Sequence, residues 1–143
     1  MTVARILIEK GNSVVTIGPA HTLDAAIHLL AEKSIGALVV TEADGRVAGI
    51  LSERDIMRVL AKLGAAALDE PVSAHMTRKV TTCGRSTTVE EVMQTMTAGR
   101  FRHVPVCEDG HLVGMVSIGD VVKRRIATVE AEHQALRDYI TTA

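Results

Sequence analysis

One sequence pattern occurs twice in this chain. The segment GRVAGILSERD at residues 45–55 returns as GHLVGMVSIGD at residues 110–120, with both glycines, the serine and the aspartate shifted by 65 positions. Self-similarity at a fixed period predicts two copies of one structural unit. A unit of about 60 residues buries only ~60% of its unfolded surface and is marginal alone, so we expect the two copies to pack face to face as one folding module.

The repeat continues upstream at a slightly different period. Three further segments match at a shift of 66: residues 14–16 with 80–82, 22–24 with 88–90, and 38–40 with 104–106. One residue is therefore lost where Thr41–Gly45 of the first copy corresponds to Cys107–Gly110 of the second. Because turn tips tolerate changes of length, the loss is predicted to lie in a turn.

Each copy is predicted to contain a strand, a helix, two strands and a second helix. The first copy opens with a β-branched run at residues 14–17, which Pro19 ends. Thr22 can cap a helix that ends near Ser34 and Gly36. The apolar face of that helix comprises Leu23, Ala26, Ile27, Leu30 and Ala31.

Two strands follow this helix in each copy. In the first copy they cover residues 37–41 and 46–51 and flank Asp44-Gly45, a pair that tolerates the positive φ angles of tight hairpin turns. The second copy repeats the arrangement around Asp109-Gly110. Residues 64–77 then form a linker between the copies, with a short helical turn expected at residues 71–76.

The tail after Asp120 differs from its counterpart in the first copy. It lacks Gly and Pro up to Ala143, and its apolar stripe has spacings of 4, 3, 4, 3 and 4 at Val122, Ile126, Val129, His133, Leu136 and Ile140. About two and a half heptads are few for a coiled coil. We therefore expect a long helix that packs on its own module or on a symmetry mate.

Composition excludes several classes of function. Aromatic residues make up 1% of the chain, so no platform for stacking single-stranded nucleic acid exists. The net charge of −1 gives no global field for a polyanion, although residues 100–103 and 123–125 are local basic clusters that suit small anions. Nucleic-acid binding is therefore the least favoured function.

Metal, redox and membrane classes are also disfavoured. Cys83 and Cys107 form neither a C-x-x-C pair nor a zinc spacing with the six histidines, so no metal site is expected. Residues 1–8 are interrupted by Arg5 and do not resemble a signal peptide, and no apolar stretch approaches the ~20 residues that span a bilayer. These features favour a cytoplasmic protein with reduced thiols and no membrane partner.

The strongest chemical pattern is Ser-x-x-Asp, at Ser52 and Asp55 and again at Ser117 and Asp120, each after a glycine-containing strand. The pattern is typical of helix capping, in which hydroxyl and carboxylate satisfy free amides. The same geometry suits a nucleotide, because a helix N-terminus binds phosphate and a carboxylate can accept both ribose hydroxyls. Both interpretations can hold together, and Arg54 could pair with a phosphate.

The ordered motifs of the second copy resemble the CBS domain, named after cystathionine β-synthase. They are Met76-Thr77, residues 80–82, 88–91 and 102–106, Asp109-Gly110, residues 113–117 and Asp120, and the first copy matches them too. The resemblance covers roughly residues 6–126. It implies a tandem pair, or Bateman module: a mixed α+β fold of two βαββα units, at residues 6–66 and 67–126, followed by a C-terminal extension at 127–143.

In such a module the units are related by a pseudo-two-fold axis, packed sheet to sheet with helices outside, and two clefts bind adenosine-containing ligands. The resemblance places the ribose-binding aspartates at Asp55 and Asp120, with Ser52 and Ser117 beside them. It places adenine contacts at Thr16, Ile17, Ile35, Gly36 and Ala37, and at Thr82, Cys83, Phe101, Arg102 and His103. Arg54, with Arg58 or Lys123 one helical turn on, would meet phosphates.

The two copies depart from each other at the expected site. Gly119 replaces Arg54, and Pro105 stands where the first copy has Val39. We therefore expect clefts of unequal affinity, of which the Arg54 cleft prefers the more phosphorylated ligand.

Function can be narrowed further by what the chain lacks. No nucleophile with its base, paired acid and base, or metal cage occurs at an interpretable spacing, which argues against an enzyme. The main hypothesis is a regulatory sensor that binds AMP, ADP, ATP or NAD and signals to a partner protein. The alternative is a homodimeric assembly module with vestigial clefts. A homodimer follows from the family's habit and the apolar helix faces, but head-to-head and head-to-tail stacking stay open, as do the ligand and the regulated partner.

Overall fold

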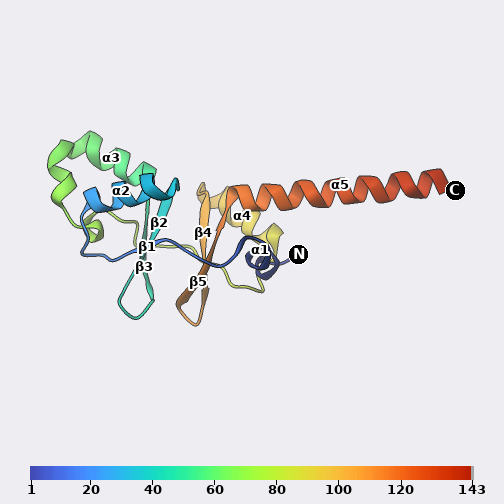
Figure 1. Cartoon of the computed structure of the whole chain (residues 1–143), viewed down its shortest axis with the longest axis horizontal. Helices are drawn as coiled ribbons and strands as arrows, with labels where there is room; N and C mark the ends of the chain where they lie inside the picture. The colour runs from blue at the N-terminus through green and yellow to red at the C-terminus, as the bar shows by residue number, and fades with distance from the viewer. Residues whose placement is uncertain (143) are drawn as a thin grey trace.

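The computed structural model describes residues 1–142 as two strand-and-helix units followed by a long projecting helix (Figure 1). The predicted mixed α+β fold is confirmed. In chain order the elements are α1 (Val3–Lys10), β1 (Thr16–Ile17), α2 (Leu23–Lys33), β2 (Ala37–Thr41), β3 (Val47–Ser52), α3 (Glu53–Leu63), the 3-10 helices η1 (Gly64–Asp69) and η2 (Val72–Ala74), α4 (Val89–Gly99), β4 (His103–Glu108), β5 (His111–Ser117) and α5 (Ile118–Thr142).

The two sheets differ in size. In the first repeat β1 pairs in parallel with β2, and β2 pairs antiparallel with β3. The strand predicted at residues 14–17 is shorter than expected, since only Thr16 and Ile17 pair. The matching strand predicted at residues 80–82 is wrong, because only Cys83 touches β4, through a parallel bridge to Val106. At this bridge the Cys83 amide donates to the Pro105 carbonyl, and the Cys83 carbonyl accepts from the Cys107 amide.

The residue lost between the copies lies in the hairpin turn, as predicted. In the first hairpin the Glu42 amide donates to the Arg46 carbonyl at 2.8 Å, which encloses a three-residue loop with Gly45 at φ 87°. In the second hairpin only Asp109 and Gly110 separate the paired strands, at φ 53° and 79°. Two central residues with positive φ are the geometry of a tight type I′ hairpin turn.

Each repeat is completed by a segment that lies outside it. The Val72 amide donates to the His21 carbonyl at 2.7 Å, which docks the linker on the first repeat. The Val3 amide donates to the Thr87 carbonyl at 2.9 Å, which docks the start of the chain at the equivalent place on the second repeat. Helix α1, which the sequence patterns did not predict, thus packs with the second repeat. The predicted division at residue 66 stays a prediction.

Buried apolar side chains form two clusters, one for each repeat. The first centres on Leu23, Leu38 and Leu51, and the second joins Val3 and Leu7 of α1 to the buried faces of α4, β4 and β5. Each repeat therefore has an apolar core of its own, while the hairpins of the two repeats meet at the bridge between Arg46 and His111. Between the sheets the chain places polar and charged side chains instead, around the cleft described below.

Helix α5 leaves the body of the protein after its first turns. Val121 is buried, whereas every residue from Val129 to Thr142 is exposed, and the helix projects along the long axis of the molecule (Figure 1). The predicted long helix is confirmed, but packing of its second half on its own module is wrong. Ala143, the last residue of the predicted extension, lies outside the described residues. Among residues 1–142, no helix is both long and apolar enough to cross a bilayer.

Docking of α1 gives a testable expectation for Leu7→Ala. Leu7 is 6% exposed and lies against Gly114, where an added Cβ would stand 2.7 Å from Leu7 Cδ2. We expect the substitution to lower the free energy of unfolding by about 2–4 kcal/mol in urea titrations, as for other buried leucines. The matched control is Ile8→Ala in the same helix, since Ile8 is 75% exposed. Equal losses for both variants would contradict the docking.

Candidate functional site

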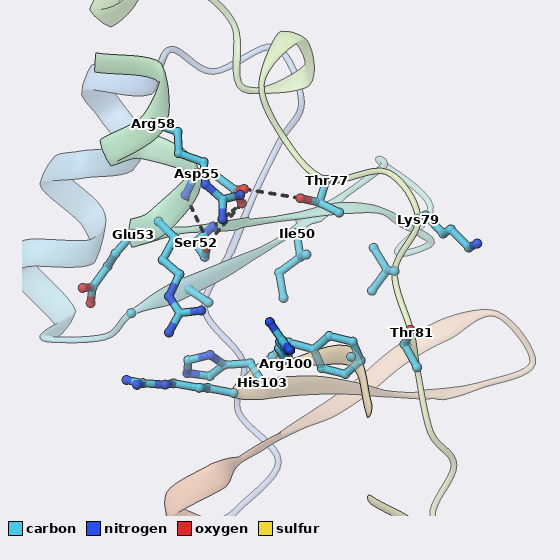
Figure 2. A pocket seen from close by; sticks show the side chains of 17 residues that line it. Ile50, Ser52, Glu53, Asp55, Arg58, Thr77, Lys79, Thr81, Arg100 and His103 are labelled. Atoms are coloured by element: carbon cyan, nitrogen blue, oxygen red, sulfur yellow. Dashed lines mark hydrogen bonds between the residues drawn. The ribbon is translucent and has the colours of Figure 1, made fainter. Parts of the chain in front are cut away.

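A cleft of about 570 Å³ lies between the two repeats (Figure 2). One wall is the junction of β3 and α3, and the other is the segment that leads from α4 into β4, with linker residues 77–81 along one side. The lining residues are Gly36, Ala37, Ile50, Ser52, Glu53, Arg54, Asp55, Arg58, Thr77, Lys79, Val80, Thr81, Gly99, Arg100, Phe101, Arg102 and His103. Its size lies in the usual range for small-molecule sites.

Ser52 and Asp55 start helix α3 at the cleft. Ser52 Oγ accepts a hydrogen bond from the Asp55 amide at 3.3 Å, and Asp55 Oδ2 accepts from the Ser52 amide at 3.0 Å. The predicted capping is therefore confirmed. Capping occupies Oδ2, whereas Oδ1 has one long contact, to Thr77 Oγ1 at 3.4 Å. Capping thus leaves an oxygen of Asp55 with capacity to accept further hydrogen bonds.

Basic side chains outnumber acidic ones around this cleft. Arg54 and Arg58 come from α3, while Arg100 and Arg102 come from the opposite wall, and Lys79 lies on the linker. The two carboxylates among the lining residues are Glu53 and Asp55. Guanidinium groups converging from two walls suit a phosphate or a chain of phosphates, which they can bind in bidentate fashion.

His103 contributes an imidazole ring to the wall opposite Ser52 and Glu53 (Figure 2). Burial lowers the pKa of His103 below its ordinary value, and the nearby Lys10 charge lowers it further. The ring lies close to Gly36, where an added Cβ would stand 3.7 Å from His103 Cε1 and 2.9 Å from Glu53 Oε1. A glycine at position 36 therefore keeps this part of the cleft open.

The second Ser-x-x-Asp motif forms the same cap but has an additional partner. Asp120 Oδ2 accepts from the Ser117 amide at 2.8 Å and from Lys10 Nζ at 2.7 Å. Burial alone would raise the pKa of Asp120, but the hydrogen bonds from Lys10 and Ser117 outweigh it and hold the pKa below its ordinary value. The carboxylate of the second repeat is therefore already paired with a cation.

The chain segment that lies beside Asp55 differs in conformation from the segment that lies at the equivalent place beside Asp120. In the first repeat Thr77 is extended and exchanges two 2.9 Å backbone hydrogen bonds with Ile50, which leaves Lys79 at the cleft edge. In the second repeat α1 stays helical to Lys10, whose amine donates to the carbonyl of Met115 at 3.0 Å. Met115 is the repeat counterpart of Ile50. A lysine side chain thus replaces a main-chain contact beside Asp120.

The structure brings together about half of the residues proposed from the sequence. Those that line the cleft at Asp55 are Gly36, Ala37, Ser52, Arg54, Asp55, Arg58, Phe101, Arg102 and His103. Thr16 and Ile17 line a separate depression beside His21 and His28, and Ile35 lines an apolar groove between α2 and α3.

The remaining proposed residues do not line this cleft; they are Thr82, Cys83, Ser117, Asp120 and Lys123. Cys83 packs against the second apolar cluster, and burial with the neighbouring Cys107 raises its pKa to about 11, so it is a poor nucleophile.

Sequence reasoning missed one side of the cleft. The missed residues are Ile50, Glu53, Thr77, Lys79, Val80, Thr81, Gly99 and Arg100. A signal was available for the linker, because a segment that joins two facing repeats has to pass between them. Among residues 1–142, no three His, Cys, Asp or Glu side chains gather as a metal site.

Comparison with known proteins gives consistent matches. A family model described as the CBS domain matches residues 3–62 and 72–127. The curated "CBS domain-containing protein CBSX3, mitochondrial" of Arabidopsis thaliana is 34% identical over 147 residues, which cover 97% of this chain and 71% of that protein. The chain spans only 23% of the length of three other CBS domain-containing proteins of that plant.

Two solved structures support the same match. The CBS-domain containing protein ATU1752 from Agrobacterium tumefaciens is 49% identical, with a TM-score of 0.84 over 87% of this chain and 99% of that one. CBSX2 in complex with AMP is 25% identical, with a TM-score of 0.76 over 89% of this chain and 97% of that one.

The Lys10 contact predicts how Asp120 responds to Lys10→Met. A lowered carboxylate pKa stabilises the fold above the ordinary value of 3.8, and this contribution is lost as pH falls through the lowered value. We expect the variant to raise the Asp120 pKa in carbonyl NMR titrations and to lose about 0.5–1 kcal/mol of stability at pH 7. The stability difference should vanish below the lowered pKa, and an unchanged Asp120 pKa would contradict the pairing.

Proposed function

Because this chain belongs to the CBS-domain family and carries two such domains, we propose that it is a non-catalytic regulatory module that binds an adenosine-containing nucleotide at Asp55. The observation that carries the proposal is the cleft itself, where a carboxylate oxygen with a single long contact, a helix N-terminus and four arginines meet between the repeats. Ribose hydroxyls would donate to Asp55, and phosphates would lie near the arginines. The AMP complex of the related CBSX2 supports this ligand class.

The charge of the cleft favours ligands with several phosphates. Arg54 and Arg58 lie one helical turn apart on α3, and both line the cleft. Arg100 lies across the cleft from Arg58 (Figure 2). Two or three phosphates offer these guanidinium groups more oxygens and more negative charge than one phosphate does. Among AMP, ADP, ATP and NAD, we therefore propose that ADP and ATP bind more tightly than AMP.

The second aspartate is a weaker candidate for ligand binding. Lys10 Nζ donates to Asp120 Oδ2 at 2.7 Å, so a ribose at Asp120 would bind beside this cation or displace it from Oδ2, and displacement costs a charge-assisted hydrogen bond. We propose that the module binds nucleotide at Asp55 in preference to Asp120, so that two similar motifs give one high-affinity site.

Signalling would follow from the position of the cleft. Its walls come from both repeats, so a bound nucleotide bridges two bodies whose buried cores are separate. A partner protein that prefers one arrangement of the repeats would then bind the occupied and empty forms with different affinity. The partner itself is unspecified, and a cytoplasmic location stays a prediction.

A homodimer is the second part of the proposal. An apolar groove of about 580 Å³ between α2 and α3 is lined by Ile27, Ile56 and Met57, and Met57 is 70% exposed. A self-complementary helical face of this kind suits association with a second copy. An assembly module without ligand binding is the competing function, and the nucleotide experiment separates the two.

Thermal shift with AMP, ATP and GTP tests the ligand class and the site. A ligand at 100 times its dissociation constant adds ~2.7 kcal/mol of stability, which gives a clear rise in Tm. We expect an adenosine-selective rise that Asp55→Asn abolishes and Asp120→Asn preserves. Asparagine keeps a side-chain oxygen that can accept from the Ser52 or Ser117 amide in both variants. No shift with any nucleotide would leave the assembly module as the function, and equal losses in both variants would contradict a preferred site.

Calorimetry on Arg100→Gln tests the role of the basic wall. We expect about tenfold weaker ATP binding, because one charge-assisted hydrogen bond contributes about 1.5–3 kcal/mol, and little change for adenosine. Arg85→Gln, at an exposed residue outside the cleft lining, is the matched control for loss of one positive charge. Equal effects of Arg100→Gln on ATP and adenosine would refute phosphate contact.

A further inference from the structure

The second half of α5 carries an apolar stripe without a partner in the described chain. Ile126, Leu136 and Ile140 are 53%, 57% and 64% exposed, and they repeat at heptad spacing. The fully exposed part of the helix, residues 129–142, would be marginal in water as an isolated helix of about four turns, so its order calls for packing on another surface. Nothing within residues 1–142 covers this stripe.

We propose that the partner is α5 of a second copy, in a parallel two-stranded coiled coil. The proposal does not depend on the nucleotide site, and it deepens the proposed homodimer by giving it a direction. Val122, Val129 and Leu136 take the d positions of the heptad, and the a positions are Ile126, His133 and Ile140. Isoleucine at a, as at residues 126 and 140, and leucine at d, as at residue 136, are typical of two-stranded pairing.

Charges beside the stripe determine the orientation. In a parallel pair each g residue faces the e residue five positions later on the other helix. Arg125 at g then faces the partner's Glu130, and Glu132 at g faces the partner's Arg137. Both complete pairs therefore join opposite charges.

An antiparallel pair would bring e residues together instead. With the apolar residues in register, Lys123 would face the partner's Arg137, and Glu130 would face the partner's Glu130. Like charges across such an interface are unfavourable. The sequence of charges along α5 thus favours the parallel arrangement.

His133 adds a polar layer within the apolar stripe. It occupies an a position, between the layers of Val129 and Leu136. A single polar a residue fixes the register of a coiled coil at a cost in stability. In a parallel pair each His133 meets the partner's His133, so a shift by one heptad would place it against an isoleucine.

Parallel tails determine how the modules stack. Helix α5 projects along the long axis, on the side of the molecule that also carries α2, α3 and α4 (Figure 1). A two-fold axis that relates parallel tails runs along this direction, so each repeat faces the same repeat of the other copy. Head-to-tail stacking would point the tails in opposite directions. The proposal therefore selects head-to-head stacking, in which the groove between α2 and α3 faces its own copy.

Cysteine crosslinking of the full chain tests the orientation. In a parallel pair two copies of Ile140→Cys share one layer and should form a disulfide under mild oxidation. In an antiparallel pair residue 140 lies opposite residue 122, and the two introduced cysteines are ~27 Å apart. The wild type, with Cys83 and Cys107, controls for background crosslinking.

The proposal is supported if Ile140→Cys crosslinks with itself. In a mixture of Ile140→Cys and Val122→Cys, no crosslink between residues 122 and 140 should form. A 122–140 crosslink would overturn the proposal. So would a dimeric mass without any crosslink at residue 140, although the homodimer itself would then stand.

Charge reversal tests the basis of the pairing. The double variant Glu130→Arg with Glu132→Arg places two positive charges at both of the pairs between g and e residues. We expect dimerisation to be at least ~10-fold weaker at low salt, measured by light scattering. Mixing it with Arg125→Glu combined with Arg137→Glu should restore association. Asp138→Arg, on the opposite face of the helix, is the matched control.

An unchanged dissociation constant would contradict the pairing. Stabilisation by AMP should persist in all these variants, so its absence would count against the nucleotide site and not against the tail.

Discussion

The helix that follows each hairpin is held at its start by reciprocal hydrogen bonds between a serine and an aspartate. At Ser52 and Asp55 these bonds satisfy amides that a helix N-terminus leaves free, and they place the carboxylate at the boundary between the repeats. Because capping uses one carboxylate oxygen, structure and ligand binding do not compete for the same atom. The cleft, its basic walls and the proposed nucleotide site are all arranged around this helix start.

The duplicated motif gives two different sites because the segments beside it differ in conformation. Residues 76–81 connect the repeats without forming a helix and pass Asp55, with Thr77 paired to Ile50. Residues 3–10 form a helix instead, and Lys10 reaches Asp120. Sequence identity of the motifs therefore does not imply equal availability of the two carboxylates. We propose that the cation beside Asp120 makes it the poorer ribose acceptor of the two.

Local features were predictable from sequence, and cross-repeat features were not. The shorter second turn, the serine caps and the long final helix follow from nearest neighbours along the chain, and the structure bears them out. The absence of a full strand before Cys83 could not be predicted, because residues 80 and 81 leave the sheet to line the cleft. Arg100 and Lys79 were missed because they approach Asp55 from the other repeat and from the linker.

The most direct test of a single preferred site at Asp55 is a crystal structure of the full chain grown with AMP. The account predicts one nucleotide for each chain, with ribose hydroxyls within hydrogen-bond distance of Asp55 and the phosphate among the arginines. Lys10 should remain paired with Asp120. A ribose bound at Asp120 with Lys10 displaced, or equal occupancy of both aspartates, would contradict the account.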